Sequence, residues 1–312
     1  AGTANWLEGT GVTLRGYRSR LDNSFQPYVL VVPVQSYQGW KPMTDTTPRR
    51  LDVVLAGRNE KRTELAFLAE HLPELVGPEK AAGEIVPADT FILHPYGRYC
   101  NATKFAGEAD VFEAMGAVRS SYAIHPDRIV VRGFSMGGAS TWHLATHHAG
   151  MWAAASPGAG FAETAVYTKA LEAGSEPRTW WEQRLWRWYD ATAYAANLYT
   201  SPTVAYAGEL DPRKQASDIM EDAARAEGVK IARVLGPQTA HAYHPDSIKA
   251  LNSLLNALVS RGRPAVPREV HLVTYTLQYP RNSWVTVTGL EKHWERADVI
   301  ARFERVGEMT LN

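Results

Sequence analysis

Residues 129–139 read IVVRGFSMGGA, and this stretch decides the fold. Its first residues are a short run of β-branched side chains, which is typical of a strand buried on both faces. A glycine-rich turn follows, and a helix is expected over 137–147. Gly133, Ser135 and Gly137 therefore match the pattern GxSxG directly between a strand and a helix, where small flanking residues let the two elements approach closely.

Strands and helices alternate on both sides of this stretch. Apolar runs between turn residues predict strands at 28–34, 51–55, 90–93, 129–131, 152–155, 203–207 and 231–235. Apolar residues on one face predict helices at 59–72, 108–122, 137–147, 215–227 and 247–261. This order predicts an α/β fold with a mostly parallel sheet and helices on both faces, and it places functional groups at the C-terminal ends of the strands.

Two parts of the chain depart from this alternation. Residues 161–200 form a tryptophan-rich insertion, which we expect to cap a catalytic domain made of residues 1–262. After the proline-rich stretch 261–267, apolar residues recur with period two at 271–279, 284–288 and 299–303. A second, β-rich unit is therefore expected over 268–312 as an antiparallel meander. It ends without a polar tail, which suggests an incomplete β structure.

The composition bounds the class of protein. The 312 residues are 45% hydrophobic, and 33 basic side chains balance 33 acidic ones, which excludes a disordered chain. A net charge of zero supplies no field for nucleic acid or an anionic membrane surface, so we expect neither partner. No run approaches the roughly 18 apolar residues that span a bilayer. The sequence leaves the oligomeric state open.

Cys100 is the only cysteine, which excludes an internal disulfide and a thiolate metal cluster. We expect it to be a small packed side chain. His143 and His147 are four residues apart, but HLATH lacks the glutamate of the zinc motif HExxH, so they are expected to be packed or solvated imidazoles. No metal or cofactor is predicted. The chain starts at Ala1 without a signal peptide, and we favour a processed secreted or periplasmic protein over a cytoplasmic one.

The pattern GxSxG between a strand and a helix predicts that Ser135 is a nucleophile. A nucleophilic serine needs an imidazole to take its proton and a carboxylate to orient that imidazole. Asp211 follows the strand 203–207, and His241 lies in the loop after the next strand. We therefore expect Ser135, Asp211 and His241 to form a catalytic triad. Glu209 competes with Asp211, and His244 competes with His241, although His244 is better placed to start the following helix.

Acyl transfer also needs two N–H donors for the developing oxyanion. The backbone of Met136, directly after the nucleophile, is the first candidate. The second is the backbone of Gly57 or Arg58, in the loop after the strand 51–55. Tyr96 lies in HPYGR at 94–98, which ends the next strand, and we expect it to shape the rim of the site as a substrate-binding residue.

These residues resemble the α/β-hydrolase superfamily. The match is closest to bacterial prolyl-oligopeptidase-like serine peptidases, of the S9 type, and to polyhydroxybutyrate depolymerase and feruloyl-type esterases. It covers about residues 17–260, including HPYGR, GFSMGG at 133–138, GELD at 208–211 and HAYHP at 241–245. Relatives commonly carry a His-Gly pair in the early oxyanion loop, whereas this chain has Ala56-Gly57. The backbone donors survive that change.

The resemblance implies a serine hydrolase that acts on a small-molecule ester or a short peptide. We rank carboxylesterase above peptidase, because oligopeptidases usually carry a β-propeller ahead of the hydrolase and only about 50 residues precede Leu51. A non-catalytic binding protein of the same fold is the alternative from another class. Trp181 and Trp188 of the insertion are expected either to line the substrate site or to pack a cap helix on its own domain.

Overall fold

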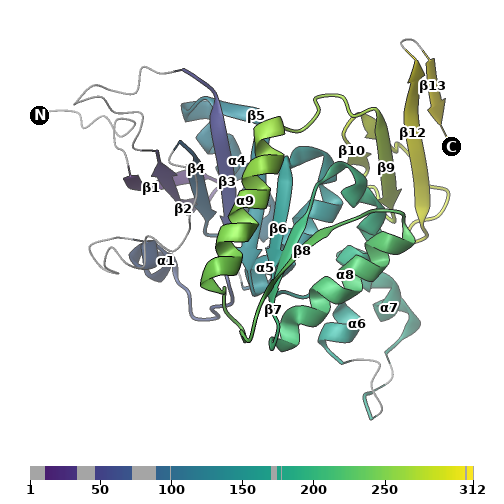
Figure 1. Ribbon diagram of the computed structural model, residues 1–312, viewed down its shortest axis with the longest axis horizontal. Helices are drawn as coiled ribbons and strands as arrows, with labels where there is room; N and C mark the ends of the chain where they lie inside the picture. Colours follow the sequence, from purple (N-terminus) through teal and green to yellow (C-terminus); the bar gives the residue numbers. More distant parts are fainter. Residues whose placement is uncertain are drawn as a thin grey trace, which may run out of the picture.

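An eight-stranded sheet forms the centre of the computed structural model, in the order β1-β2-β4-β3-β5-β6-β7-β8 (Figure 1). The structure describes residues 11–33, 46–71, 89–98, 100–169, 174–176, 178–305 and 308–311. The strands are β1 (Gly11–Arg18), β2 (Phe25–Val32), β3 (Arg49–Leu55), β4 (Phe91–Pro95), β5 (Ile124–Phe134), β6 (Ala154–Gly158), β7 (Val204–Gly208) and β8 (Ala232–Gly236). β1 and β2 run antiparallel at one edge, and the strands from β4 to β8 are parallel. The predicted mostly parallel α/β sheet is confirmed.

Helices cover both faces of this sheet. The bounds are α1 (Glu64–His71), α4 (Ala106–Ser121), α5 (Met136–His147), α8 (Gln215–Ala226) and α9 (Pro245–Arg261). Successive residues of a strand point to opposite faces. Val130 accordingly packs in a core with α9, and Val131 packs in a second core with α4, α5 and α8. No helix of the described ranges is both apolar enough and long enough to cross a membrane.

The first helix is shorter than the sequence predicts. It begins at Glu64 instead of residue 59, because the Thr63 hydroxyl accepts a hydrogen bond from the amide of Ala66 at 3.2 Å and so starts the helix. The predicted ends at residue 34 of the first strand and at residue 72 of this helix lie outside the described residues.

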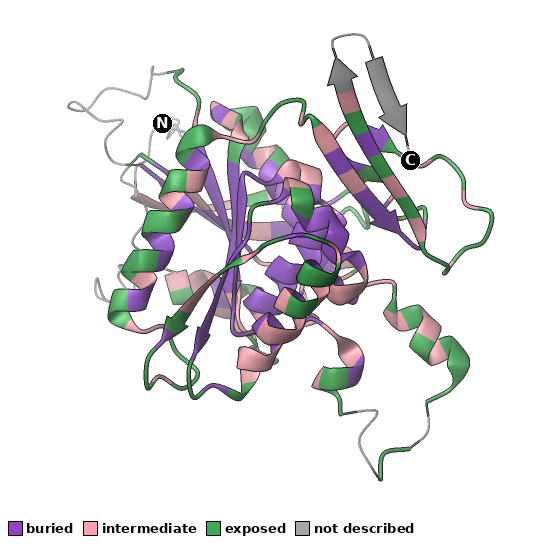
Figure 2. Ribbon diagram, turned by 45° about the vertical axis from the view of Figure 1, so that its right-hand side comes forward, coloured by how far each residue is buried: buried purple, intermediate pink, exposed green. Residues whose placement is uncertain are grey.

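The insertion after β6 contains α6 (Thr164–Tyr167), α7 (Trp180–Trp186) and the 3₁₀ helix η4 (Ala191–Thr200); η3 (Ala149–Met151) and η5 (Pro212–Lys214) are two further 3₁₀ turns. Thr179 and Glu182 form a capping box that starts α7. α7 has no buried residue, whereas the central strands are almost wholly buried (Figure 2). The insertion is therefore anchored through η4, which packs on α5 and α8.

The strands after residue 267 pair differently from the predicted meander. β9 (Glu269–Thr274), β12 (Ala297–Arg305) and β13 (Glu308–Leu311) form one antiparallel sheet, while β10 (Arg281–Asn282) and β11 (Val285–Thr286) form a separate ribbon. β9 ends at Thr274 because Tyr275 and Tyr279 turn inward to pack on Tyr194 of η4. The domain boundary between residues 262 and 268 stays a prediction.

The turn from β5 into α5 is packed too closely for any side chain at its glycines. A Cβ at Gly133 would lie 2.6 Å from the carbonyl oxygen of Gly137. A Cβ at Gly137 would overlap the carbonyl oxygen of Leu55 in β3, and one at Gly138 would overlap that of Gly158 in β6. Backbone atoms cannot rotate away as a flexible side chain can. These glycines therefore fix the start of α5 against the ends of two neighbouring strands.

We predict that the same substitution has opposite effects in two helices. Gly137→Ala forces β3 and α5 apart and should lower the free energy of unfolding by at least about 2 kcal/mol. Gly116→Ala, on the exposed face of α4 with open space around it, should raise it by up to about 1 kcal/mol, because alanine favours helix. Urea midpoints measure both variants, and a Gly137→Ala midpoint at or above that of the parent protein would contradict the packing argument.

Candidate active site

Ser135 lies between β5 and α5 in a backbone conformation that non-glycine residues rarely adopt, with φ 59° and ψ −120°. Its amide donates a hydrogen bond to the carbonyl of Gly158 at 2.8 Å, which holds the strained residue against β6. The side chain consequently projects from the C-terminal end of the sheet, at the N-terminus of α5. The helix dipole there favours negative charge that develops next to the serine oxygen.

His241 and Asp211 extend in line from this serine. Nε2 of His241 lies 2.9 Å from Oγ of Ser135, and Nδ1 lies 2.8 Å from Oδ2 of Asp211. The Asp211 side chain is fully buried, while 41% of the His241 side chain is exposed. The second oxygen of Asp211 accepts the amide of Arg213 at 2.8 Å. With Nδ1–H donating to the aspartate, Nε2 is left free to accept the serine proton.

The two competing residues have other partners. Glu209 accepts hydrogen bonds from the amide and the side chain of Gln238, at 2.8 and 3.0 Å. Nδ1 of His244 accepts the amide of Asp246 at 3.3 Å and caps α9. The structure thus brings His241, and not His244, to Ser135.

The expected oxyanion donors lie around the same serine. Met136 begins α5 directly after the nucleophile. A Cβ built on Gly57 would lie 4.0 Å from Cβ of Ser135, so the loop after β3 runs beside the nucleophile. The side chain of Arg58 points to Glu60, with which it forms an exposed ion pair. Of these two residues, the backbone and not the Arg58 side chain lies in a position that fits the expected second donor.

A pocket of about 840 Å³ opens beside Ser135 and His241. Four aromatic side chains contribute to its lining, together with Cys100, Lys104, Arg213 and others; the aromatic residues are Phe105, Phe161, Tyr167 and Tyr189. Sequence reasoning did not identify Phe105, Phe161 or Tyr167 as part of a site, whereas Tyr189 belongs to the aromatic cluster of the insertion that was considered for one. Cys100 is half-buried, with its sulfur 3.5 Å from that of Met136.

The aromatic residues that the sequence suggested lie elsewhere. Neither Trp181 nor Trp188 lines the pocket. Trp181 is 49% exposed on α7, and Trp188 packs on Phe105 and Trp294 at centroid distances of 6.2 and 5.3 Å. Tyr96 lines a smaller neighbouring pocket of about 140 Å³, which shares Met136 and Cys100 with the large one. Its hydroxyl donates to the carbonyl of Arg62 at 3.1 Å.

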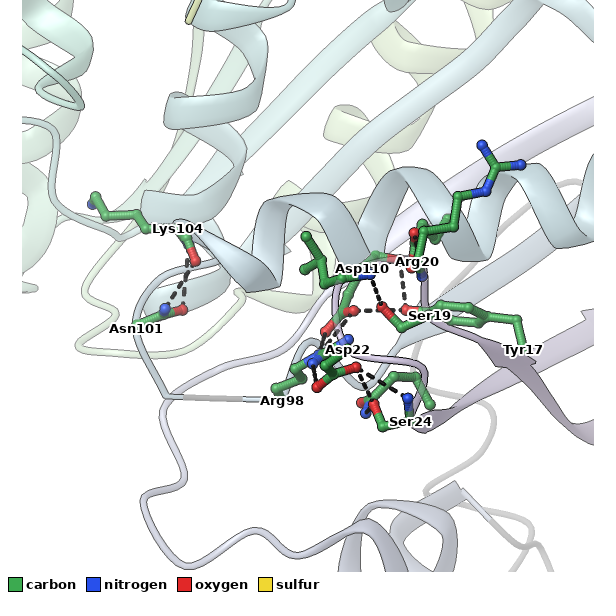
Figure 3. A network of polar contacts seen from close by, with 12 residues as sticks. Tyr17, Ser19, Arg20, Asp22, Ser24, Arg98, Asn101, Lys104 and Asp110 are labelled. Atoms are coloured by element: carbon green, nitrogen blue, oxygen red, sulfur yellow. Dashed lines mark hydrogen bonds and ion pairs between the residues drawn. The ribbon is translucent and has the colours of Figure 1, made fainter.

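The loop that follows β4 is tied to α4 and β1 by an ionic network (Figure 3). The guanidinium of Arg98 contacts Asp110 of α4 at 2.8 Å and Asp22 at 2.5 Å. Asp110 also accepts a hydrogen bond from the hydroxyl of Tyr17 at 2.9 Å. Asp110 is almost fully buried, so loss of its partner Arg98 would be costly. The loop is therefore held to α4 through Asp110 and to the turn after β1 through Asp22.

The two histidines of α5 are packed rather than solvated. Nε2 of His143 lies 2.5 Å from Glu108 of α4, which also contacts His148 at 3.1 Å and accepts from the Tyr279 hydroxyl at 3.1 Å. Burial opposes ionisation of Glu108, but the hydrogen bonds from His143 and His148 hold its pKa well below the usual range. His147 lies fully buried beside them. Across the described residues, no three His, Cys, Asp or Glu side chains are grouped to hold a metal ion.

Solved structures with the same fold include peptidases and esterases. A protein from Bacteroides ovatus assigned as a dipeptidyl aminopeptidase IV is 11% identical, with a TM-score of 0.57 over 81% of this chain and 36% of its own. A ferulic acid esterase is 16% identical, with a TM-score of 0.55 over 80% of this chain and 97% of its own. S-formylglutathione hydrolase from Staphylococcus aureus is 15% identical, with a TM-score of 0.54 over 83% and 100%. This chain thus spans about a third of the Bacteroides protein and nearly all of the other two.

Comparison of the sequence with family models identifies the family, which similarity of fold alone does not. No curated protein gives a significant match. The family model described as the prolyl oligopeptidase family, Peptidase_S9, matches residues 101–256, which is half of the chain and includes Ser135, Asp211 and His241. The chain is therefore a serine hydrolase with the α/β-hydrolase fold, and it belongs to the prolyl oligopeptidase family.

Proposed function

We propose that this protein hydrolyses carboxylic esters through an acyl-enzyme intermediate, with Ser135 as nucleophile, His241 as general base and Asp211 as the residue that orients the imidazole. The observation that carries the proposal is the hydrogen-bonded line from Oγ of Ser135 through His241 to the buried Asp211, with distances of 2.9 and 2.8 Å. A binding protein that performs no chemistry has no need of this line.

In the first step Oγ of Ser135 attacks the ester carbonyl carbon while its proton passes to Nε2 of His241. The carbonyl oxygen becomes an oxyanion, which the N–H of Met136 and that of Gly57 or Arg58 stabilise. The tetrahedral intermediate then expels the alcohol, which takes the proton from His241, and the acyl group stays on Ser135. Water repeats the sequence with the same base and releases the carboxylic acid.

Peptide hydrolysis is the second candidate, and membership of the prolyl oligopeptidase family favours it. An amide nitrogen leaves only after protonation, whereas an ester releases its alcohol more readily, so the peptidase reaction demands tighter placement of His241. Similarity to a ferulic acid esterase and to S-formylglutathione hydrolase along nearly their whole lengths supports ester chemistry. We therefore rank ester hydrolysis first.

We predict that a fluorophosphonate probe labels the protein at Ser135. Labelling should vanish in Ser135→Ala, which removes the nucleophile, and in His241→Ala, which removes the base, and turnover of a p-nitrophenyl ester should fall by at least about 10⁴-fold in both. Mass spectrometry of the adduct identifies the labelled residue. Persistent labelling in Ser135→Ala would exclude this serine as the nucleophile.

His244→Ala is the matched control, because it removes the other imidazole of the same loop. It should keep the labelling and lose about 1 kcal/mol of stability, since only the cap of α9 is removed. Loss of labelling in His244→Ala with retention in His241→Ala would reverse the assignment of the base. Absence of labelling in the parent protein would favour the binding-protein alternative.

We also predict that esters are turned over faster than amides. A panel of acetyl, feruloyl and hydroxyalkanoate p-nitrophenyl esters and peptide p-nitroanilides, tested on one preparation, should give kcat/KM values at least about tenfold higher for the best ester. The parent protein is compared with Ser135→Ala to subtract spontaneous hydrolysis. A peptide anilide at the head of the panel would assign the protein as a peptidase with the same catalytic residues.

A further inference from the structure

The large pocket beside Ser135 carries an excess of positive charge. Among its lining residues are Arg58, Lys104 and Arg213, against the two carboxylates Glu60 and Asp211. Glu60 forms an ion pair with Arg58, and Asp211 is occupied by His241 and by the amide of Arg213. Neither carboxylate is thus available to compensate Lys104.

Lys104 contacts aromatic rings instead of an acid. Nζ lies 4.9 Å from the ring centroid of Phe161 and 4.7 Å from that of Tyr189, both of which line the pocket. Within the part of the chain that the structure describes, this ammonium has no hydrogen bond and no ion pair. The nearby carboxylate, Asp190, is bonded to the amide and hydroxyl of Thr164, at 3.0 and 2.5 Å. Aromatic faces offset only part of the cost of taking an ammonium out of water.

The backbone that carries Lys104 is held in place. The side chain of Asn101 accepts the amide of Lys104 at 3.3 Å and donates to its carbonyl at 2.9 Å (Figure 3). Thr103 donates to the hydroxyl of Ser140 on α5 at 2.8 Å. Ala102, Thr103 and Phe105 all have φ near +55°, which is unfavourable for residues other than glycine. Such strain persists where the surroundings fix a residue in one position.

Arg213 adds a second cation to the pocket. Its guanidinium lies 4.9 Å from the ring centroid of Tyr167, and no carboxylate of the described residues forms an ion pair with it. Buried or half-buried cations are ordinarily paired with an acid. A pocket with aromatic walls and two cations that form no ion pair within the described residues suits a ligand that brings an apolar body and a negative charge.

We propose that this pocket selects ester substrates that carry a carboxylate in addition to the scissile ester, and that Lys104 is the residue that recognises it, with Arg213 as the second cation of the pocket. The inference rests on the proposed function and specifies its substrate class. The aromatic residues Phe161, Tyr167 and Tyr189 would take the apolar part of the substrate. The additional carboxylate can be on the acyl group or on the alcohol group of the ester, since both groups lie next to Ser135 when the ester is bound.

Matched pairs of esters test the proposal. In the acyl arm, p-nitrophenyl monoesters of adipic, pimelic and suberic acid are compared with the same compounds capped as methyl esters. In the alcohol arm, 4-acetoxybenzoate is compared with its methyl ester. The parent protein should give a kcat/KM at least about tenfold higher for the anionic member in one arm, which is the effect of one charge-assisted hydrogen bond.

Variants of the two cations identify the residue responsible. Lys104→Met should lower the anionic-to-neutral ratio by at least about tenfold, and Arg213→Met by about threefold, because the direct contact with the carboxylate is assigned to Lys104. Lys104→Arg, which keeps the charge, should restore most of the ratio. Lys249→Met is the matched control, because Lys249 is 65% exposed on α9 and pairs with Asp246, so the ratio should not change.

The anionic-to-neutral ratio of kcat/KM should also depend on pH, which a merely structural role of Lys104 would not produce. Burial lowers the pKa of the Lys104 ammonium to about 8, against the opposing effect of Asp190. The ammonium is charged below that pH, so the preference for the anionic ester should decline as the pH rises from 7 to 9.5. Burial raises the pKa of Asp190 to about 7, against its hydrogen bonds with Thr164. The charge of Lys104 also helps to lower the pKa of Asp190, so Lys104→Met changes the ionisation of Asp190 too. Asp190→Asn is therefore measured beside it, and a decline that persists in Asp190→Asn belongs to Lys104. Burial lowers the pKa of the neighbouring His143 and raises that of Tyr189, so neither accounts for a change between pH 7 and 9.5.

Two results would overturn the proposal: equal kcat/KM for both members of every pair in the parent protein, or a ratio that Lys104→Met leaves unchanged. If Ser135 is still labelled by the fluorophosphonate and neutral esters are still hydrolysed, only the substrate class is wrong and the proposed function stands. If neither labelling nor turnover occurs, both proposals are wrong.

Discussion

The close approach of backbone to backbone at the start of α5 is the constraint on which the rest of the site depends. Gly137 touches the end of β3, and Gly138 touches the end of β6, with no room for a Cβ at either position. Because α5 begins this close to the sheet, Ser135 is forced into a left-handed conformation and its side chain projects beyond the strand ends. The same contact brings Gly57, which follows β3, to within reach of the nucleophile.

Parallel pairing then delivers the other groups to the same edge. β7 and β8 run parallel to β5, so the loops after them open where Ser135 lies. Asp211 follows β7 by three residues and is buried, whereas His241 comes from the longer loop after β8 and keeps an exposed edge. A buried carboxylate with two donors is fixed in orientation, and an imidazole held by it at one nitrogen presents the other toward the serine. The carboxylate at the buried end of the line is thus held in one orientation, while the imidazole between it and Ser135 stays accessible.

The sequence predicts those parts of the site that a local pattern of residues marks. The positions of Ser135, Asp211 and His241 were predictable because each follows a strand whose apolar run is legible, and parallel strand ends share one edge. Trp181, Leu185 and Trp188 recur at helical spacing in the sequence, which predicts a shared helix face. It does not predict which way that face points, since orientation is set by contacts from distant segments. Lys104 lies in an irregular loop whose conformation depends on hydrogen bonds and left-handed residues, which no periodicity marks. Period two likewise predicted strands after residue 267, but not their partners.

The C-terminal end of α5 contacts segments that are remote in the sequence. These contacts bury His143 and His147. Glu108 is buried among His143, His148 and Tyr279, so α4, α5 and the C-terminal segment share one charged hydrogen-bonded group. Asn197 adds a second link, since its side chain bonds the carbonyl of Thr146 in α5 and both backbone groups of Val273 in β9. A buried carboxylate that loses a partner is costly, so these contacts resist any sliding of α5. The helix that carries the nucleophile at its N-terminus is consequently clamped at both ends: by glycine packing near Ser135, and by polar contacts with the last strands at the other.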